Sequence, residues 1–413
     1  MKITFVTVSP TAIDSLKKGA WEINAEYGNV LTLKTYYAVA DLPKKGLEEM
    51  AEAIISGGLV FVDLMGSPPR IIGAVYGALE KCRGNIVPFG SSAREFLRLG
   101  SFAPGSNRRP AGIEAKKSMK DMKAMAMAVP PEKMRDMSNY ARLCKYFTAA
   151  NDRNMKNMLL LILSQYGGLT VSGEIEPPVE IPDVAYMLPE DMSAAESLEE
   201  YREKAGITGT RPSVALLCSS TSYPTDTSGC VRDIFKELSS WADVYIVGIA
   251  SWAGDDRGEL LEKLLYDVRP DAVVNVMPFR LSAGPMGGDT DAGVTLLQGL
   301  NTPYLHPHFI TRRQRQQWQD SVQGCTPSEV LISVMLPELD GATDTIPVAA
   351  MVEPEEGILT EKLDIIPERL HRLSGKLKGY IRLRKLSNSE KRVAVICYNY
   401  PPGEANQIGR AHV

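Results

Sequence analysis

The sequence lacks the common motifs that would assign a chemistry. Its 413 residues contain no G-x-x-x-x-G-K-[ST] phosphate loop, no G-x-G-x-x-G after a strand and no H-E-x-x-H. Its six cysteines stand singly, without a Cys-x-x-Cys pair, and it has four histidines. We therefore expect no ATP hydrolysis by this chain, no paired-cysteine zinc site and no tightly bound cofactor. A histidine-based metal centre is also hard to build from so few histidines.

A strong charge excess and a long apolar run are absent as well. The formal net charge is −4, so nothing favours nucleic acid or an anionic membrane as a partner. No apolar run approaches the roughly 18 residues of a membrane span. The N-terminus enters a strand pattern without a signal-peptide cleavage region. Together with single cysteines in apolar surroundings, which are typical of reduced thiols, these absences predict a cytoplasmic protein without a membrane span.

Residues 1–110 alternate strand and helix signals, which predicts a first α/β domain. Apolar residues repeat at the spacing of one helix face from Ile13 and again from Leu47. Four apolar runs read as strands: Ile3–Val8, Val30–Tyr37, Leu59–Leu64 and Ile86–Phe89. This alternation is typical of a parallel sheet with helices on both faces.

The composition changes over the next two stretches. Residues 111–170 are helical in pattern and rich in methionine. Residues 171–210 read as a linker because they carry the Pro- and Glu-rich run Glu174–Pro182, which disfavours regular structure.

A second α/β domain is predicted for residues 211–390. Its expected strands are Val214–Cys218, Val244–Ile249, Ala272–Met277 and Tyr304–Phe309. Residues 391–413 read as the truncated start of a further domain. Val393–Cys397 reads as a strand apolar enough to need burial on both faces, and we expect it to join the edge of the preceding sheet or to stay partly exposed. The predicted fold class is therefore α/β. It consists of two flavodoxin- or Rossmann-like parallel-sheet units, a helical segment and Pro/Glu-rich linker between them, and the truncated start of a third unit.

Two loops of the second domain are candidate binding loops, because ligands bind at the carboxyl ends of parallel strands. Residues 219–229 offer hydroxyl groups and Asp226, although the same residues suit the N-cap of a helix. Residues 278–291 are rich in glycine and contain Arg280 and Asp289. Arg280 is suited to hold a carboxylate, and a flexible surface loop is the alternative interpretation.

Two further groups of residues are candidates. His306 and His308 flank a proline at a strand end, where they suit either a metal or proton acceptor or ordinary packing. The Pro/Gly loop after Val393–Cys397 contains three candidate binding residues: Tyr398, Asn399 and Glu404. The basic run 312–315 reads as a solvated helix face.

Several segments resemble the large subunit of ATP-dependent tetrapyrrole metal chelatases, a family that includes cobaltochelatases and magnesium chelatases. The segments are Asn301-Thr-Pro-Tyr-Leu, Gln314-x-x-Gln-Trp318, Gly324-x-x-Pro327-Ser-Glu, Val334-Met-Leu-Pro-Glu-Leu-Asp-Gly341 and Asn388–Asn406. The resemblance covers about residues 140–413 by motif and residues 1–110 by pattern. The sequence departs from the family at 223–229 and 186–189, where members usually carry histidine and this chain has none.

The resemblance implies the N-terminal part of a subunit that holds a tetrapyrrole while cobalt or magnesium is inserted as a substrate. It also implies that separate ring-forming ATPase subunits use the ATP, and that the isolated fragment is inactive. The missing histidines keep a second interpretation open, in which the chain is a non-catalytic module that binds a tetrapyrrole or scaffolds partners.

Overall fold

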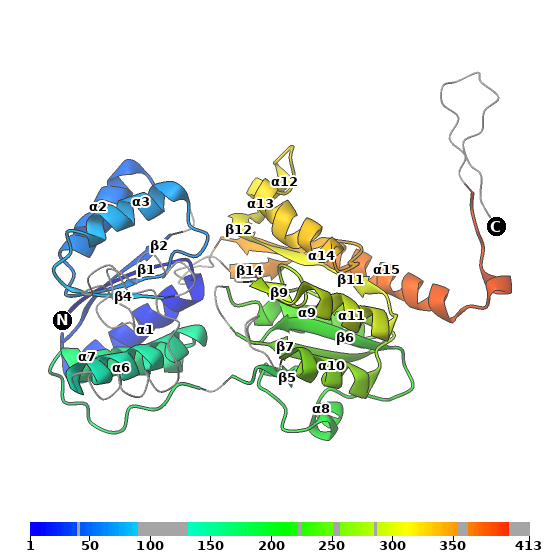
Figure 1. Cartoon of the computed structure of the whole chain (residues 1–413), viewed down its shortest axis with the longest axis horizontal. Coiled ribbons are helices and arrows are strands. Elements are labelled where there is room, and N and C mark those ends of the chain that lie inside the picture. The colour runs from blue at the N-terminus through cyan, green and yellow to red at the C-terminus, as the bar shows by residue number, and fades with distance from the viewer. Residues whose placement is uncertain are drawn as a thin grey trace, which may run out of the picture.

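The computed structural model describes residues 1–38, 42–89, 131–179, 181–221, 225–250, 257–284, 287–353 and 362–395. It is a mixed α/β structure in which parallel strands form the centre of two sheets, as the sequence predicts. Figure 1 shows the first sheet with its helices on one side of the view and the second sheet with its helices on the other. None of the described helices is long and apolar enough to cross a membrane.

The first sheet is parallel throughout, with the strand order β2-β1-β3-β4. Its strands are β1 (Lys2–Thr7), β2 (Thr32–Tyr37), β3 (Leu59–Val62) and β4 (Asn85–Pro88). Two helices, α2 (Lys44–Ile55) and α3 (Pro69–Leu79), cover one face. The other face is covered by α1 (Pro10–Tyr27), α6 (Pro131–Thr148) and α7 (Asp152–Tyr166). The predicted strands and the buried helix face from Ile13 are confirmed.

The helices α6 and α7 share one core with the first sheet. Phe147 of α6 stacks on Phe89 with ring centroids 4.6 Å apart, and Phe89 in turn stacks on Phe61 of β3. The sequence treats residues 111–170 as a separate helical segment. The described part of that segment is instead the second helix layer of the first sheet, because its apolar side chains complete the core on that face.

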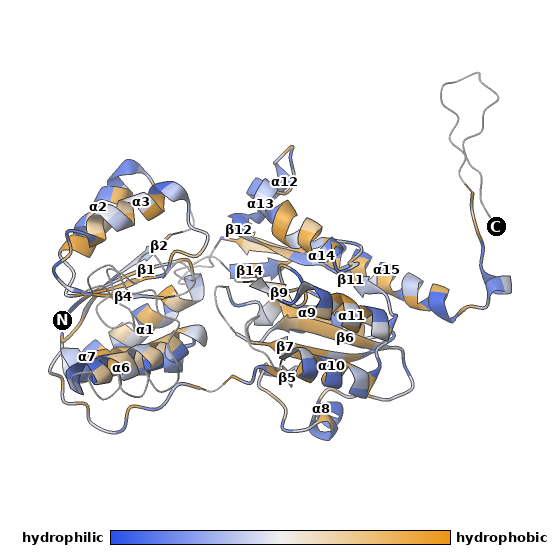
Figure 2. Cartoon of the chain, viewed as in Figure 1, coloured by the Kyte–Doolittle hydropathy of each residue, from blue (hydrophilic) through white to orange (hydrophobic). Residues whose placement is uncertain are grey.

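The second sheet has the order β11-β8-β6-β7-β5. Its parallel strands are β6 (Ser213–Ser219), β7 (Asp243–Ile249), β8 (Ala272–Asn275) and β11 (Tyr304–Leu305). An antiparallel edge strand, β5 (Val184–Tyr186), lies within the stretch read as a linker. The surrounding helices are α8 (Leu198–Lys204), α9 (Ser228–Ser239), α10 (Arg257–Val268) and α11 (Thr290–Leu300). A short hairpin, β9 (Ala283–Gly284) with β10 (Gly287–Gly288), precedes α11. The strands are apolar and the outer faces of the helices are hydrophilic (Figure 2).

A small third sheet joins β12 (His308–Gln314), β13 (Pro347–Val352) and β14 (Lys362–Ile365). The predicted strand Tyr304–Phe309 is therefore wrong as one element, since the chain leaves β11 at Leu305 and pairs with another sheet from His308. The basic run 312–315 is also not a helix face. It lies largely in β12, and the short helix α12 (Arg315–Gln319) begins at its end.

The last part of the chain is helical and then extended. The helix α15 (Pro367–Lys385) packs against the second and third sheets. The predicted strand from Val393 is wrong in its described part, because residues 391–395 form no strand. The expected alternative, exposure of this stretch, is confirmed for Val393 and Val395, which are 84% and 79% exposed. Among the described residues, no strand pairs with this stretch to bury the two valines. The rest of that prediction, residues 396–413, lies outside the described residues.

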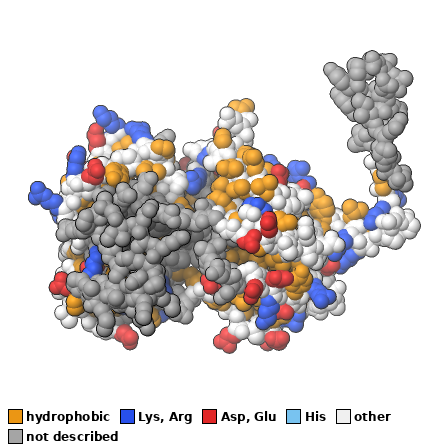
Figure 3. All heavy atoms as spheres, viewed as in Figure 1, with side chains coloured by type: hydrophobic (Ala, Val, Ile, Leu, Met, Phe, Trp, Pro, Cys, Tyr) orange, Lys and Arg blue, Asp and Glu red, His pale blue; other side chains and the backbone are white. Residues whose placement is uncertain are grey.

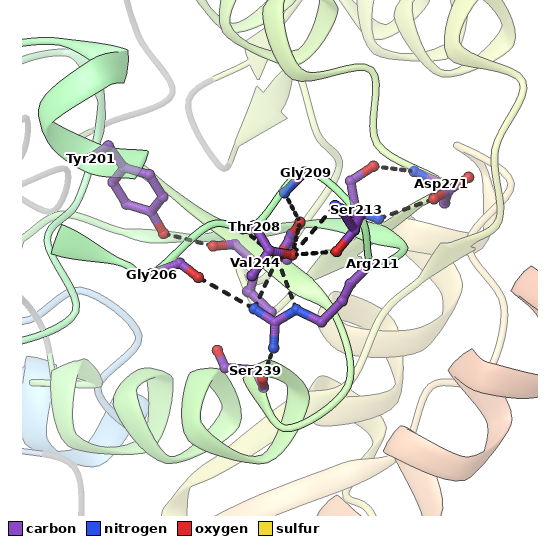
Figure 4. A network of polar contacts seen from close by, with 11 residues as sticks. Tyr201, Gly206, Thr208, Gly209, Arg211, Ser213, Ser239, Val244 and Asp271 are labelled. Carbon is purple, nitrogen blue, oxygen red and sulfur yellow. Dashed lines mark hydrogen bonds and ion pairs between the residues drawn. The ribbon is translucent and has the colours of Figure 1, made fainter. Parts of the chain in front are cut away.

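A polar network around the buried carboxylate of Asp243, at the amino end of β7, stabilises the second sheet (Figure 4). Asp243 accepts hydrogen bonds from the Arg211 Nε (2.9 Å) and from the backbone amides of Thr208 (3.1 Å) and Gly209 (2.7 Å). Burial alone would raise the pKa of Asp243, but these donors outweigh it and lower the pKa. The network lies at the sheet edge opposite the carboxyl ends of the strands, so it serves the fold.

Candidate functional site

The carboxyl edges of the two main sheets face each other. Thr11 and Gly66 follow β1 and β3 of the first sheet, and Asp226 follows β6 of the second. The backbone amide of Asp226 donates a hydrogen bond to the Thr11 hydroxyl (3.2 Å), and the Arg312 guanidinium donates to the Gly66 carbonyl (2.8 Å). The region between the sheets is therefore bordered by carboxyl-end loops from both, which is where α/β sheets bind ligands.

A shallow cavity of about 470 Å³, widely open to solvent, lies on this border. Its lining residues come from the start of α1, the start of α7 and the loop before α9: Thr11, Ser15, Ala150, Asn151, Asp152, Arg153 and Asp226. Two of its charged side chains have partners. Asp152 accepts a hydrogen bond from Ser15 (2.8 Å) and pairs with Lys18, and Arg153 pairs with Glu176. Because both ion pairs are exposed, they stabilise the fold little and leave the groups accessible to a ligand.

Asp226 lies on this cavity and also caps a helix. Its Oδ1 accepts a hydrogen bond from the backbone amide of Ser228 (2.9 Å) at the start of α9, while Thr227 makes no side-chain capping bond. The two interpretations of the 219–229 loop, a helix cap and a polar lining, are thus compatible at this residue.

Arg280 has a structural partner. Its guanidinium forms an ion pair with Asp340 (2.6 Å), whose side chain is fully buried, and donates to the Thr290 carbonyl (2.8 Å). Asp340 also accepts from the backbone amide of Leu281 (2.7 Å). Because β6 and β8 are parallel neighbours, the Arg280 and Asp226 loops leave the same sheet edge, as predicted. The Arg280 guanidinium is nevertheless already occupied by a carboxylate of the protein itself. It is therefore not free for the role expected from the sequence, which was to bind a carboxylate of a ligand.

Asp289 caps α11, since its carboxylate accepts from the backbone amides of Asp291 (2.9 Å) and Ala292 (3.2 Å). Tyr398, Asn399 and Glu404 lie outside the described residues. These four candidates remain sequence predictions as ligand contacts.

His306 and His308 are buried at the junction of β11 and β12. Both ring nitrogens of His306 and the Nδ1 of His308 have no hydrogen-bond partner among the residues that the structure describes, and the His308 Nε2 lies 3.8 Å from the Cys325 Sγ. Burial lowers the pKa of His306 to about 3 and that of His308 to about 4, and a charge on His308 would lower the pKa of His306 further. In the described ranges no three His, Cys, Asp or Glu side chains are grouped to hold a metal ion.

The sequence interpretation missed Arg312. Its neighbours Arg313 and Arg315 pair with Glu329 and Asp364, whereas the exposed Arg312 reaches across to the first sheet without an ion-pair partner among the described residues. In a strand, successive side chains point to opposite faces, so Arg312 lies on the other face from Arg313. Reading 312–315 as a strand, and not as a helix, would have revealed this difference.

Comparisons with known proteins place the chain in a family. The family model described as CobN/Magnesium Chelatase matches residues 144–413. The chain is 28% identical over 299 residues to a magnesium-chelatase subunit of Chlorobaculum parvum, a match that covers 69% of this chain and 22% of that protein. It is 26% identical over 157 residues to the aerobic cobaltochelatase subunit CobN of Sinorhizobium sp, covering 36% of this chain and 11% of the relative.

Among solved structures, the catalytic subunit of cobaltochelatase from Mycobacterium tuberculosis has a similar fold. The TM-score is 0.50 at 17% identity, and the match covers 97% of this chain and 29% of that subunit. The chain thus spans less than a third of the length of these relatives. Because the family model covers well over half of its residues, the chain belongs to the CobN/magnesium chelatase family.

Proposed function

We propose that this chain is the N-terminal part of the tetrapyrrole-binding large subunit of an ATP-dependent chelatase that inserts cobalt or magnesium. The observation that carries the proposal is the family match over residues 144–413, together with a fold likeness that extends over nearly the whole chain. The metal ion is a substrate in this proposal, and the macrocycle is the molecule that the protein holds.

The border between the two sheets is the part of this chain that we assign to the tetrapyrrole. Biosynthetic tetrapyrroles carry carboxylate side chains, and the exposed Arg312 can bind a carboxylate bidentately. The open cavity lined by Asp226 and Arg153 supplies further hydrogen-bonding groups. The Arg312 donor now satisfied by the neutral Gly66 carbonyl would bind an anionic group more strongly.

Metal insertion also requires two pyrrole N–H protons to be removed and the ring to be distorted. We assign no catalytic residue in this chain. ATP hydrolysis falls to separate ring-forming ATPase subunits, a role supported by the lack of a phosphate loop here. The purified chain alone should release no ADP from ATP in a coupled assay, and turnover near the roughly 1–100 s⁻¹ of kinases would overturn this assignment.

Tetrapyrrole binding is tested by quenching of tryptophan fluorescence. A porphyrin with free propionates should bind the chain, and its dimethyl ester should bind more weakly. Arg312→Gln should weaken binding of the free acid by about tenfold, the effect of losing one charge-assisted hydrogen bond. Arg384→Gln, which changes an exposed arginine on α15, is the matched control. No quenching by the free acid, or equal losses in both variants, would overturn the assignment.

A second function is a non-catalytic module that carries a tetrapyrrole without inserting metal. The observation that favours it is the lack of histidine at 186–189 and 223–229. The absorption spectrum of a bound tetrapyrrole, recorded with a divalent metal, ATP and the ATPase subunits, discriminates the two. A shift to the metallated spectrum supports the chelatase, and an unchanged spectrum supports the carrier.

A further inference from the structure

A row of large apolar side chains is exposed on the helix that follows α12. This helix is continuous through α13 (Pro327–Val330), the π turn η1 (Leu331–Met335) and α14 (Leu336–Glu338). Leu331, Met335 and Leu339 are 46%, 55% and 63% exposed. Hydrophobic side chains gather over this helix in Figure 3. The chain therefore presents an apolar row, Leu331–Met335–Leu339, to its surroundings.

The π turn aligns the three side chains. The backbone amide of Leu336 bonds to the Leu331 carbonyl, five residues back. In a regular α-helix, residues eight apart are rotated by about 80° around the axis. The wider turn between Leu331 and Met335 offsets most of this rotation, so Leu331 and Leu339 lie on nearly the same line. The result is one straight apolar face.

The opposite face of the helix is fixed by buried charges. Glu329 pairs with Arg313 (2.6 Å), and Asp340 pairs with Arg280 (2.6 Å). Ser333 and Pro337, which lie between these carboxylates, are buried. Turning the apolar row inward would break both ion pairs, and leaving a buried charge without its partner is strongly destabilising. The row is thus fixed in its outward orientation.

We propose that this apolar row is the docking surface for the rest of a chelatase large subunit, the part that the present chain does not span. The inference rests on the proposed function. The matched relatives are more than three times as long as the stretch they share with this chain, so a subunit of the proposed kind has a large further part that is available to cover this row. A contact within one subunit is permanent, and permanent contacts are the apolar ones, whereas a cycling ATPase partner would favour a more polar surface.

Met335 itself supplies the test, because hydrogen peroxide oxidises exposed methionine to the sulfoxide and spares covered methionine. The probe is the part of the Chlorobaculum parvum subunit that lies outside its match, purified as a separate polypeptide. On adding it, the oxidation rate of Met335 should fall at least about fivefold. Met134, which is 52% exposed on α6, is the matched control and should keep its rate.

Two variants and a fusion protein sharpen the result. Leu331→Ser with Leu339→Ser should abolish the protection of Met335, while Leu383→Ser, an exposed leucine on α15, should leave it intact. In a chimera, this chain replaces the matching stretch of that subunit. The two parts are then covalently joined, so the protection of Met335 no longer depends on the affinity between two separate polypeptides. Met335 should oxidise more slowly in the chimera than in the isolated chain.

Three outcomes would overturn the proposal: equal oxidation of Met335 in chimera and isolated chain, protection that survives the double variant, or protection caused only by self-association at high concentration. Tetrapyrrole quenching measured on the same samples separates this inference from the proposed function. Protection of Met335 without quenching would overturn the tetrapyrrole assignment and keep the docking surface.

Discussion

Mild acid should destabilise the part of the chain that contains His306 and His308. Both imidazoles are buried, and in the described part of the chain no carboxylate forms a hydrogen bond with either of them. Two charged groups act on them electrostatically: Glu329 raises the pKa of His308, and a charge on His308 lowers the pKa of His306. Cys325 contacts His308 as a neutral thiol, since burial raises its pKa. Protonation therefore has little compensation in the folded state.

The size of the effect follows from the pKa values. An unfolded histidine binds a proton near pH 6.5, whereas the folded pKa values are about 3 for His306 and about 4 for His308. Between pH 6.5 and 4 the unfolded chain binds more protons than the folded one, so the free energy of unfolding falls as the pH falls. At pH 5 each histidine lowers it by about 2 kcal/mol, or about 4 kcal/mol together. A typical domain has about 5–15 kcal/mol in total.

The assay is urea unfolding at pH 7.5 and pH 5, followed by the fluorescence of the tryptophans. His306→Phe removes one titrating group from an apolar site, and it should reduce the difference between the two pH values by about half. His371→Gln is the matched control, because its side chain is 86% exposed. Carboxylates with lowered pKa values, such as Asp243, act in the same direction only near and below pH 4, outside this window.

The reasoning fails if the urea midpoint is the same at pH 7.5 and pH 5. It also fails if His306→Phe with His308→Leu keeps the full pH dependence of the parent chain. Either result would mean that the two imidazoles take up protons in the folded state through water or a rearrangement of the β11–β12 junction.

Three further outcomes are expected. Asp243→Ala should lower the free energy of unfolding by about 3 kcal/mol in urea, because Arg211 and two amides lose their acceptor. Gly66→Ala should lower the free energy of unfolding by about 1–3 kcal/mol, since φ is +75° and the new methyl group would meet the Arg312 guanidinium. In thermal unfolding, adding Arg312→Ala to this variant should recover the share of the loss that comes from the steric contact. Among the described residues, trypsin should cut first after Arg392, in an exposed stretch without helix or strand, and protection there would contradict the described structure.

The strands of the first sheet could be predicted to within two residues. Their apolar runs are bounded by glycine, proline or polar residues, and each run is short enough to exclude a helix. The run Tyr304–Phe309 was wrongly predicted as a single strand, because Pro307 lies inside it. The proline ends the pairing of β11 with β8 and lets β12 join a different sheet. Local apolarity gives the existence of a strand, while the sheet it joins depends on residues far along the chain.

The candidate site divides in the same way. That the loops after β6 and β8 share an edge follows from parallel topology, which the sequence pattern indicates. The partner of Arg280 does not follow, because Asp340 lies sixty residues later and nothing local marks it as buried. Arg312 could not be placed either, since its role depends on the approach of a loop from the other sheet.

The motif Val334–Gly341 shows why a family resemblance does not by itself locate a binding site. Within it the carboxylate of Asp340 is buried against Arg280, while Met335 and Leu339 are exposed. A helix of an isolated domain buries its apolar residues and exposes its charged ones. The reversed arrangement suits a helix that lies between two layers. Its polar face binds one layer through ion pairs, and its apolar face is available to pack against the other layer. Within this motif Asp340 thus holds the framework together through Arg280, whereas the tetrapyrrole contacts that we propose lie in the loops between the two sheets.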